Sequence, residues 1–212
     1  MRRTLEIAVF ALAATFAALV TGVGSAGAAL PHTQKIVVRP VHSNGTPVAG
    51  YSVSHESIPN FTCSGASAGA VDPNIEWCGY SSTYTVACWK SANHTVLCLR
   101  DPMRKHLVRI HYQGAFTPVA APRHPSPQAL TLFSGNYCTV RDGGAWPQIH
   151  GHPNWYGTYS CQHNGIYGGS GDGINRSVNP WSVHVVNNPN NNTPHAIVVR
   201  RVKDAFYVGT SS

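Results

Sequence analysis

The sequence contains few charged residues and no sign of amphipathic helices. Only 11% of its 212 residues are charged, and 8 aspartates and glutamates stand against 15 lysines and arginines. Beyond residue 28, no window of about a dozen residues keeps apolar side chains at helical spacing. Short runs rich in Val, Ile, Thr, Tyr and Trp recur instead between clusters of Gly, Pro, Asn and Ser. The missing helical pattern therefore argues against helical and parallel α/β folds and predicts an all-β fold.

Closely spaced Cys-x-x-Cys pairs, which a structural zinc site needs, are also missing. The six cysteines form an even set, and in an exported chain they favour three disulfides. Cys88 and Cys98 flank a polar turn, so a hairpin folded symmetrically about Asn93 would place them opposite each other. Proximity along the chain then selects, from several possible sets, the bridges Cys63–Cys78, Cys88–Cys98 and Cys138–Cys161.

Only one long apolar run occurs, and it lies at the N-terminus. Arg2 and Arg3 precede residues 7–23, which are almost all apolar or small, and Ala26-Gly27-Ala28 follows as a small-x-small pattern. These parts of a secretory signal stand in their usual order, so we predict a signal peptide over residues 1–28. An uncleaved membrane anchor is the alternative, but the small residues at the exit and the lack of a later apolar run argue against it. We therefore expect a secreted, basic mature chain with no transmembrane segment.

Apolar residues occupy both faces of the first predicted hairpin. Val86 and Val96 would face one side, while Trp89 and Leu97 would face the other. Because both faces then need cover, we predict a disulfide-stapled antiparallel sandwich or barrel. The predicted strands cover residues 34–41, 83–90, 95–99, 106–112, 130–133, 137–141, 157–161, 181–186, 196–202 and 206–208.

Proline is concentrated in residues 116–128, which hold four of the 15 prolines. This density excludes the interior of a strand and favours an extended connector. The connector divides the mature chain into an N-terminal β sub-domain, residues 29–115 with four cysteines, and a C-terminal one, residues 129–212 with two. We interpret the halves as two sub-domains of one unit.

Four segments in the C-terminal half form a recognisable set. They cover residues 137–146 (YCTVRDGGAW), 157–161 (GTYSC), 181–183 (WSV) and 207–210 (YVGT), and residues 97–102 (LCLRDP) extend the set upstream. In these segments the sequence resembles a group of secreted actinobacterial proteins, of the mycobacterial type, with six cysteines. The resemblance implies export and a shared disulfide fold. It implies no known activity, so it assigns no catalytic residue.

Basic residues gather in one short stretch of the N-terminal half. A strand from His106 would place Arg109 and His111 beside Lys105 on one face, as a basic edge. One interpretation is contact with anionic polymers or lipid headgroups, and the other is a soluble face that discourages strand pairing. Nucleic acid is not an expected partner, because the stretch lacks interleaved aromatic residues. The candidate binding residues are Arg100, Arg104, Lys105, Arg109 and His111.

Trp146 and Trp155 flank a loop rich in Gly and Pro and are candidates for stacking on sugar rings, although most tryptophans in a small β-protein belong to its core. A glycosidase would also need two carboxylates that face each other across a cleft. Asp72 and Glu76 share a disulfide loop, and Asp142 lies near Trp146. A glycan-directed hydrolase is therefore the alternative function.

His150 and His152, with His163 further along the chain, form the candidate metal site. Alternate residues of an extended segment point the same way, so these imidazoles suit zinc or copper. A solvated loop is the competing interpretation, because Pro147 and Pro153 fit no regular strand and no carboxylate lies nearby to orient a ligand.

No stretch of the sequence meets the requirements of a known catalytic or cofactor motif. Gly65-Ala66-Ser67-Ala68-Gly69 has the letters of a nucleophile elbow but lacks the flanking strand and helix. We therefore predict no catalytic residue and no cofactor. The leading hypothesis is a secreted non-enzymatic protein that binds anionic polymers of the cell envelope or a host surface through its basic stretch and aromatic loops.

Overall fold

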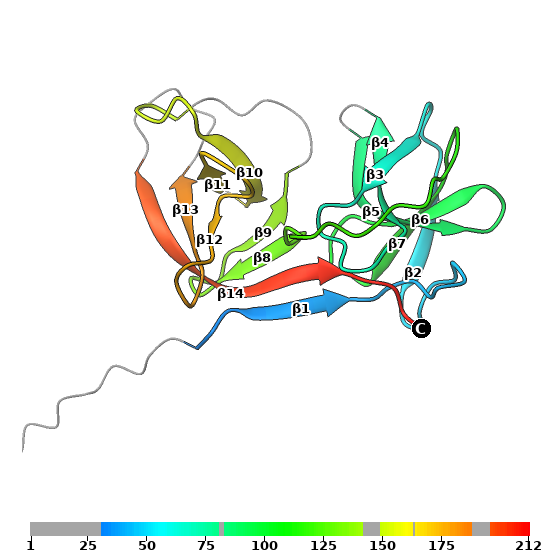
Figure 1. Cartoon of the computed structure of the whole chain (residues 1–212), viewed down its shortest axis with the longest axis horizontal. Helices are drawn as coiled ribbons and strands as arrows, with labels where there is room; N and C mark the ends of the chain where they lie inside the picture. The colour runs from blue at the N-terminus through cyan, green and yellow to red at the C-terminus, as the bar shows by residue number, and fades with distance from the viewer. Residues whose placement is uncertain (1–30, 81–82, 142–148, 163, 188–195) are drawn as a thin grey trace, which may run out of the picture.

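The structure is a computed structural model, and it describes residues 31–80, 83–141, 149–162, 164–187 and 196–212. The predicted signal peptide, residues 1–28, lies outside the described residues. All regular elements in the described residues are β-strands, which confirms the predicted all-β class. They form two curled sheets that lie side by side (Figure 1). No helix of this part of the chain is long and apolar enough to cross a membrane.

The first sheet contains six strands from the N-terminal half. In chain order they are β2 (Ser52–Glu56), β3 (Thr62–Ala66), β4 (Ile75–Tyr80), β5 (Thr83–Ser91), β6 (Thr95–Leu99) and β7 (His106–His111). Strands β3 to β7 pair antiparallel with their neighbours in the chain, and β2 pairs parallel with β7. A parallel bridge joins Thr62 to Gln113, so the sheet curls until the start of β3 meets the end of β7.

The second sheet contains a closed ring of strands. Its members are β1 (Gln34–Val38), β8 (Ala129–Leu132), β9 (Tyr137–Val140), β10 (Tyr156–Cys161), β11 (Asn164–Gly168), β12 (Ile174–Asn175), β13 (Ser182–Asn187) and β14 (Ile197–Val208). Because β14 pairs with both β8 and β13, strands β8, β9, β10, β11, β13 and β14 close into a barrel. Strands β1 and β12 extend this sheet outside the ring, and β1 pairs parallel with β14.

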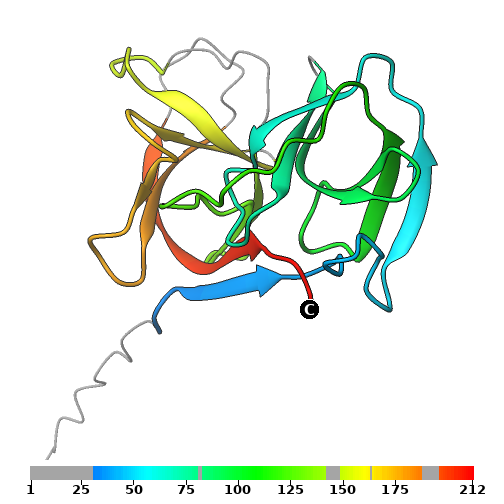
Figure 2. The same ribbon diagram turned by 45° about the vertical axis from the view of Figure 1, so that its right-hand side comes forward.

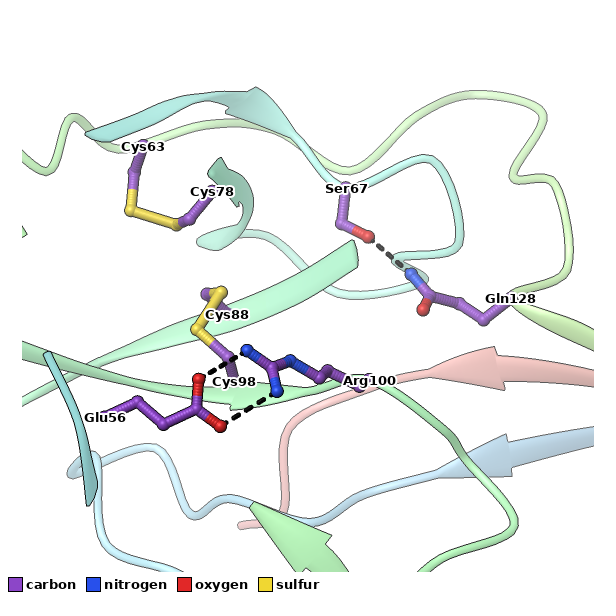
Figure 3. Close-up of a disulfide and its surroundings, with 8 residues drawn as sticks. All are labelled: Glu56, Cys63, Ser67, Cys78, Cys88, Cys98, Arg100 and Gln128. Carbon is purple, nitrogen blue, oxygen red and sulfur yellow. Dashed lines mark hydrogen bonds and ion pairs between the residues drawn. A yellow bond between two sulfur atoms is a disulfide. The ribbon is translucent and has the colours of Figure 1, made fainter. Parts of the chain in front are cut away.

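Each of the three predicted disulfides is present. The bridges Cys63–Cys78, Cys88–Cys98 and Cys138–Cys161 each join residues that lie directly opposite each other on adjacent antiparallel strands. Two of them lie close together in the first sheet (Figure 3). The hairpin argument for Cys88 and Cys98 is therefore confirmed, and all described cysteines are paired.

Both faces of the β5–β6 hairpin are buried, as the sequence predicts. On one face Trp89 and Leu97 pack with Val208 from the end of the chain. On the other face Val96 packs with Phe61 beside the disulfides. A separate core fills the barrel of the second sheet and includes Leu130, Leu132, Tyr159, Ile166, Val185, Val202 and Ala205.

Strand β14 is one continuous strand of 12 residues where the sequence predicts two. Lys203 and Asp204 interrupt the apolar pattern and produce the apparent break. A register shift beside Val202 accommodates them, and the Thr131 hydroxyl donates a hydrogen bond to the buried Asp204 carboxylate. The strand therefore continues because its polar residue finds a partner inside the sheet.

Strands of each predicted sub-domain pair with or pack against the other sub-domain. Strand β1 lies in the predicted N-terminal sub-domain, yet it pairs with β14 of the second sheet. Val208 at the end of β14 packs into the core of the first sheet. The boundary at residues 116–128 therefore does not separate the two sheets, and the halves are interlocked.

Five strands, namely β2, β3, β4, β11 and β12, are missing from the predicted set. Strands β2 and β3 read SVSHE and TCSGA, which carry little of the β-branched and aromatic character that marks a strand. Residues 116–128 contain no strand, as predicted. Ser126 N–H donates to Ala68 and Gln128 N–H donates to Phe206, at 2.8 and 2.7 Å, so this connector is fixed to both halves.

The C-terminal tail is held against the first sheet by Arg39 and Asp72. Arg39 forms an ion pair with Asp72 and donates to the Thr210 carbonyl at 2.6 Å, and Thr210 N–H donates to the Asp72 carboxylate at 2.8 Å. A Cβ on Gly209 would lie 2.7 Å from Asp72 Oδ2 and 2.8 Å from Arg39 Nη1. Only glycine fits at this contact without displacing the ion pair.

Replacing Gly209 with alanine is expected to lower the free energy of unfolding by about 0.5–1 kcal/mol, because the added methyl group must displace the partly exposed side-chain ends of Arg39 and Asp72. Urea denaturation of the wild type and Gly209→Ala measures the change. Ser211→Ala, on the same tail, is the control and is expected to change the value by less than about 0.5 kcal/mol. Equal stability of Gly209→Ala and the wild type would show that the contact does not fix the tail.

Candidate anion-binding pocket

A cavity that gathers charged side chains has a volume of about 650 Å³ and lies along β1 and the end of β14. These two strands lie side by side in both views of the chain (Figures 1 and 2). The cavity is lined by Lys35, Val37, Val71, Arg123, His124, Pro125, Ser126, Gly171, Asp172, Arg176 and Tyr207. It therefore brings four basic side chains together around one carboxylate.

Three segments that are distant in the sequence form the walls. Lys35 and Val37 alternate along β1, so both side chains lie on one face of this strand. The connector contributes residues 123–126, and the turn between β11 and β12 contributes Gly171 and Asp172. The pocket exists because β1 is added to the edge of the second sheet while the connector is fixed to both halves.

The Asp172 carboxylate is held by several donors. The Arg176 guanidinium donates to both of its oxygens, with 2.9 Å between Nη1 and Oδ1, and the Ser126 hydroxyl and the Ile174 N–H also donate to it. Burial by itself raises the pKa of Asp172, but the hydrogen bonds and charge of Arg176 outweigh burial and lower this pKa below its usual value. Asp172 is therefore ionised at neutral pH and serves as the counter-ion of Arg176.

Arg176 is fixed on its other sides as well. Its guanidinium carbon lies 5.1 Å from the centre of the Trp181 ring, and the Tyr207 hydroxyl accepts a hydrogen bond from it. The hydrogen bond to Asp172 is the main reason that the pKa of Arg176 is raised. Arg176 thus lines the pocket with its charge already neutralised by Asp172.

Two further cations in the pocket have no counter-ion among the described residues. The Lys35 Nζ lies 5.4 Å from the centre of the Trp181 ring, a cation–π contact that leaves its charge uncompensated. Arg123 is exposed, and no ion pair or hydrogen bond joins its guanidinium to a described residue. The pocket consequently presents a net positive charge to solvent.

The predicted basic edge is dispersed in the structure. Strand β7 lies between β2 and β6, so it is not an edge strand. Arg109 is half-buried and donates to the hydroxyls of Ser91 and Thr95, at 2.8 and 3.1 Å. Val108, Ile110 and Tyr112 are buried, as predicted.

The other basic residues of this stretch are partly neutralised by carboxylates. Arg100 donates two hydrogen bonds to Glu56, at 2.9 and 2.7 Å, and Arg104 lies 3.4 Å from Asp101. Lys105 and His111 are exposed. The stretch therefore offers fewer uncompensated charges than its sequence suggests.

Of the two candidate tryptophans, Trp146 lies outside the described residues. Trp155 is half-buried between two imidazoles, with ring centres 4.2 Å from His152 and 4.8 Å from His184. It also packs against the small core that includes Ile149 and Tyr167. These contacts agree with the core interpretation of this residue.

The candidate metal site is only partly within the structure, because His163 lies outside the described residues. His150 and His152 lie on a turn, and the His152 ring packs against Trp155 in a tilted contact. No group of three metal-ligating side chains gathers among the residues that the structure describes. Metal binding by these histidines stays a prediction.

Ser67, the central residue of the elbow-like sequence, is fully buried and accepts a hydrogen bond of 2.7 Å from the Gln128 side chain (Figure 3). A nucleophile has to reach its substrate, so this serine is a structural residue. The structure agrees with the rejection of the elbow from sequence.

The described carboxylates give a glycan hydrolase little support. Asp142 lies outside the described residues, and Glu76 is buried with 1% of its surface exposed. The other acidic side chains are engaged in ion pairs or hydrogen bonds, as Figure 3 shows for Glu56; they are Glu56, Asp72, Asp101, Asp172 and Asp204. A glycosidase needs an acid and a base with access to one glycosidic bond.

The pocket residues were missed from sequence because they share no local pattern. Lys35, Arg123 and Arg176 belong to separate segments that only the parallel β1–β14 pairing and the connector bring together. The one local signal is the spacing of four residues between Asp172 and Arg176, which is common for ion pairs and indicates no ligand.

Comparisons with protein-family models, curated proteins and solved structures find no match to this chain.

Proposed function

We propose that the protein is a secreted non-enzymatic protein that binds anionic polymers of the cell envelope or a host surface, and that the pocket between β1 and the connector is its contact site. The observation that carries this proposal is the pair of cations, Lys35 and Arg123, that share a cavity without a counter-ion among the described residues. Both side chains are exposed, so an anion from solvent can reach the two charges without displacing a partner.

The chemistry of the pocket fits a charged polymer better than a neutral ligand. Guanidinium groups bind phosphate, sulfate and carboxylate groups through paired hydrogen bonds. A chain with an excess of basic residues also attracts polyanions over a longer range. The resemblance to secreted actinobacterial proteins would make an envelope polymer of such a cell the natural partner.

Secretion is supported by the N-terminal signal pattern and by three disulfides, which persist in oxidising surroundings. The exported protein is expected to begin at Ala29 and to carry no free thiol. Intact-mass spectrometry of the secreted product, with and without reduction, measures both properties. A retained N-terminus or a mass that is unchanged by reduction would contradict this part of the proposal.

Co-sedimentation with purified cell envelope tests the binding itself. The bound fraction of the wild type is expected to fall steeply as salt rises from about 50 to 500 mM, because added ions screen the attraction between charges. Soluble polyanion added to the mixture is expected to release the protein. Absence of binding at low salt, or binding that salt does not weaken, would count against an anionic partner.

A further inference from the structure

The pocket has a definite number of uncompensated charges. It contains three permanent cations, Lys35, Arg123 and Arg176, and one carboxylate, Asp172. The carboxylate is bound to Arg176 through both oxygens, so this pair is neutral as a unit. Lys35 and Arg123 remain, which gives two positive charges from two different walls of one cavity.

A single group that satisfies both charges at once has to carry two negative charges. A phosphate monoester has a charge between about −1.5 and −2 at pH 7, and its oxygens accept from an arginine fork and a lysine ammonium at the same time. A sulfate ester or a carboxylate carries one charge and would leave one of the two cations uncompensated. The charge count therefore favours a phosphate monoester.

The cavity is also much larger than a phosphate group. Its volume of about 650 Å³ lies within the range of sites that hold small organic ligands. Val37, Val71 and Pro125 supply apolar surface beside the charges, and Tyr207 supplies an aromatic side chain. The space and the mixed walls suit the body of a saccharide unit that carries the charged group.

We propose that the pocket takes a phosphate monoester on a saccharide unit, with the phosphate between Lys35 and Arg123. The inference rests on the anion-binding function proposed above and names the chemical class of its ligand. Asp172 is then a specificity-determining residue, because it neutralises Arg176 and keeps the number of available charges at two. Without its carboxylate, Arg176 would add a third charge.

Titration calorimetry at pH 7.5 and low salt tests the proposal with five probes: glucose 6-phosphate, inorganic phosphate, glucose 6-sulfate, glucuronate and glucose. Glucose 6-phosphate is expected to bind at least about tenfold more tightly than the sulfate, the glucuronate and inorganic phosphate, and glucose is expected not to bind. Inorganic phosphate that binds as tightly as glucose 6-phosphate would remove the saccharide from the proposal.

Variants locate the site. Lys35→Ala and Arg123→Ala are each expected to weaken glucose 6-phosphate binding about tenfold, since each removes a charge-assisted contact from an exposed side chain. Arg104→Ala is the matched control, because Arg104 is highly exposed and lies outside the pocket, and it is expected to leave the affinity unchanged. An equal loss in the control, or no loss in either pocket variant, would overturn the assignment of the site.

Asp172→Asn provides a test of opposite sign. Its release of Arg176 is expected to raise the affinity for glucose 6-sulfate and glucuronate at least about threefold and so to reduce the preference for phosphate. Unchanged affinities in a folded Asp172→Asn variant would contradict the role of Asp172. If polymer binding is observed while the sulfate and phosphate bind equally to the wild type, the anion-binding function stands and the phosphate inference fails.

Discussion

Replacing Glu76 with glutamine is expected to make the protein more stable at pH 8 and to remove most of the pH dependence of its stability between pH 5 and pH 8. Glu76 lies on β4, opposite Ala66 of β3 and Cys88 of β5. Its side chain is 1% exposed, and its Oε1 has no hydrogen-bond partner in the described structure. Burial raises the pKa of Glu76 to about 7.

The direction in which stability changes with pH follows from how the folded and unfolded states bind protons. The folded-state pKa of Glu76 is raised above the ordinary value of 4.5, so between these two values the folded protein holds a proton that the unfolded chain releases. The contribution of Glu76 to the free energy of unfolding is therefore fully present below about pH 4.5 and is lost as pH rises through about 7. The full loss from this group is about 3 kcal/mol. A glutamine has no proton to lose, so the Glu76→Gln variant avoids this loss of unfolding free energy.

Urea denaturation at pH 5 and pH 8 measures this difference for the wild type and Glu76→Gln. Glu56→Gln is the control, since Glu56 is a more exposed glutamate in the same sheet that is paired with Arg100, and this variant is expected to keep the pH dependence of the wild type. Equal wild-type stability at the two pH values would refute the expectation. So would a pH dependence that persists in Glu76→Gln.

Removing the Cys138–Cys161 bridge is expected to have the largest effect among the disulfides, at about 3.4 kcal/mol of unfolding free energy. The three bridges span sequence separations of 23, 15 and 10 residues, for Cys138–Cys161, Cys63–Cys78 and Cys88–Cys98 in that order. A longer closed loop restricts the unfolded chain more strongly, and the same relation gives about 3 kcal/mol for the second bridge and about 2.7 kcal/mol for the third.

Paired Cys→Ala variants, compared by urea denaturation under non-reducing conditions, rank the three bridges. Five of the six cysteines are buried and Cys63 is half-buried, so the differences between the alanine pairs report mainly on loop length. A ranking in which the Cys88–Cys98 variant is the least stable of the three would contradict the loop argument. It would point instead to the packing of that bridge in the core beside Val96.

Features of the fold that depend on residues close in sequence could be predicted. The Cys88–Cys98 bridge follows from a hairpin whose turn and flanking strands lie within one short segment. The strand of residues 95–99 was predicted with its observed bounds. All five of its residues are apolar or β-branched, and the polar turn around Asn93 marks its start. The burial of both hairpin faces follows from the same residues.

Features that depend on distant pairings could not be predicted. The parallel pairing of β1 with β14 joins the two ends of the described chain. Neither strand has a sequence pattern that indicates which strand it pairs with. The pocket could not be predicted for the same reason, since Lys35 lies on β1 and Arg123 lies on the connector. The basic stretch at residues 100–111 attracted attention because its charges are adjacent in sequence, yet Arg100 and Arg109 are occupied by partners from other strands.

The most direct test of the proposed function compares two double variants of equal charge. Lys35→Ala with Arg123→Ala removes the uncompensated charges of the pocket, whereas Arg104→Ala with Lys105→Ala removes the same charge from the exposed basic stretch. Affinity for a phosphorylated polysaccharide, measured at one low salt concentration, is expected to fall at least about tenfold in the pocket variant and less than about twofold in the other. An equal loss in both would show that net charge alone governs binding, and a larger loss in the Arg104 and Lys105 variant would move the binding site away from the pocket.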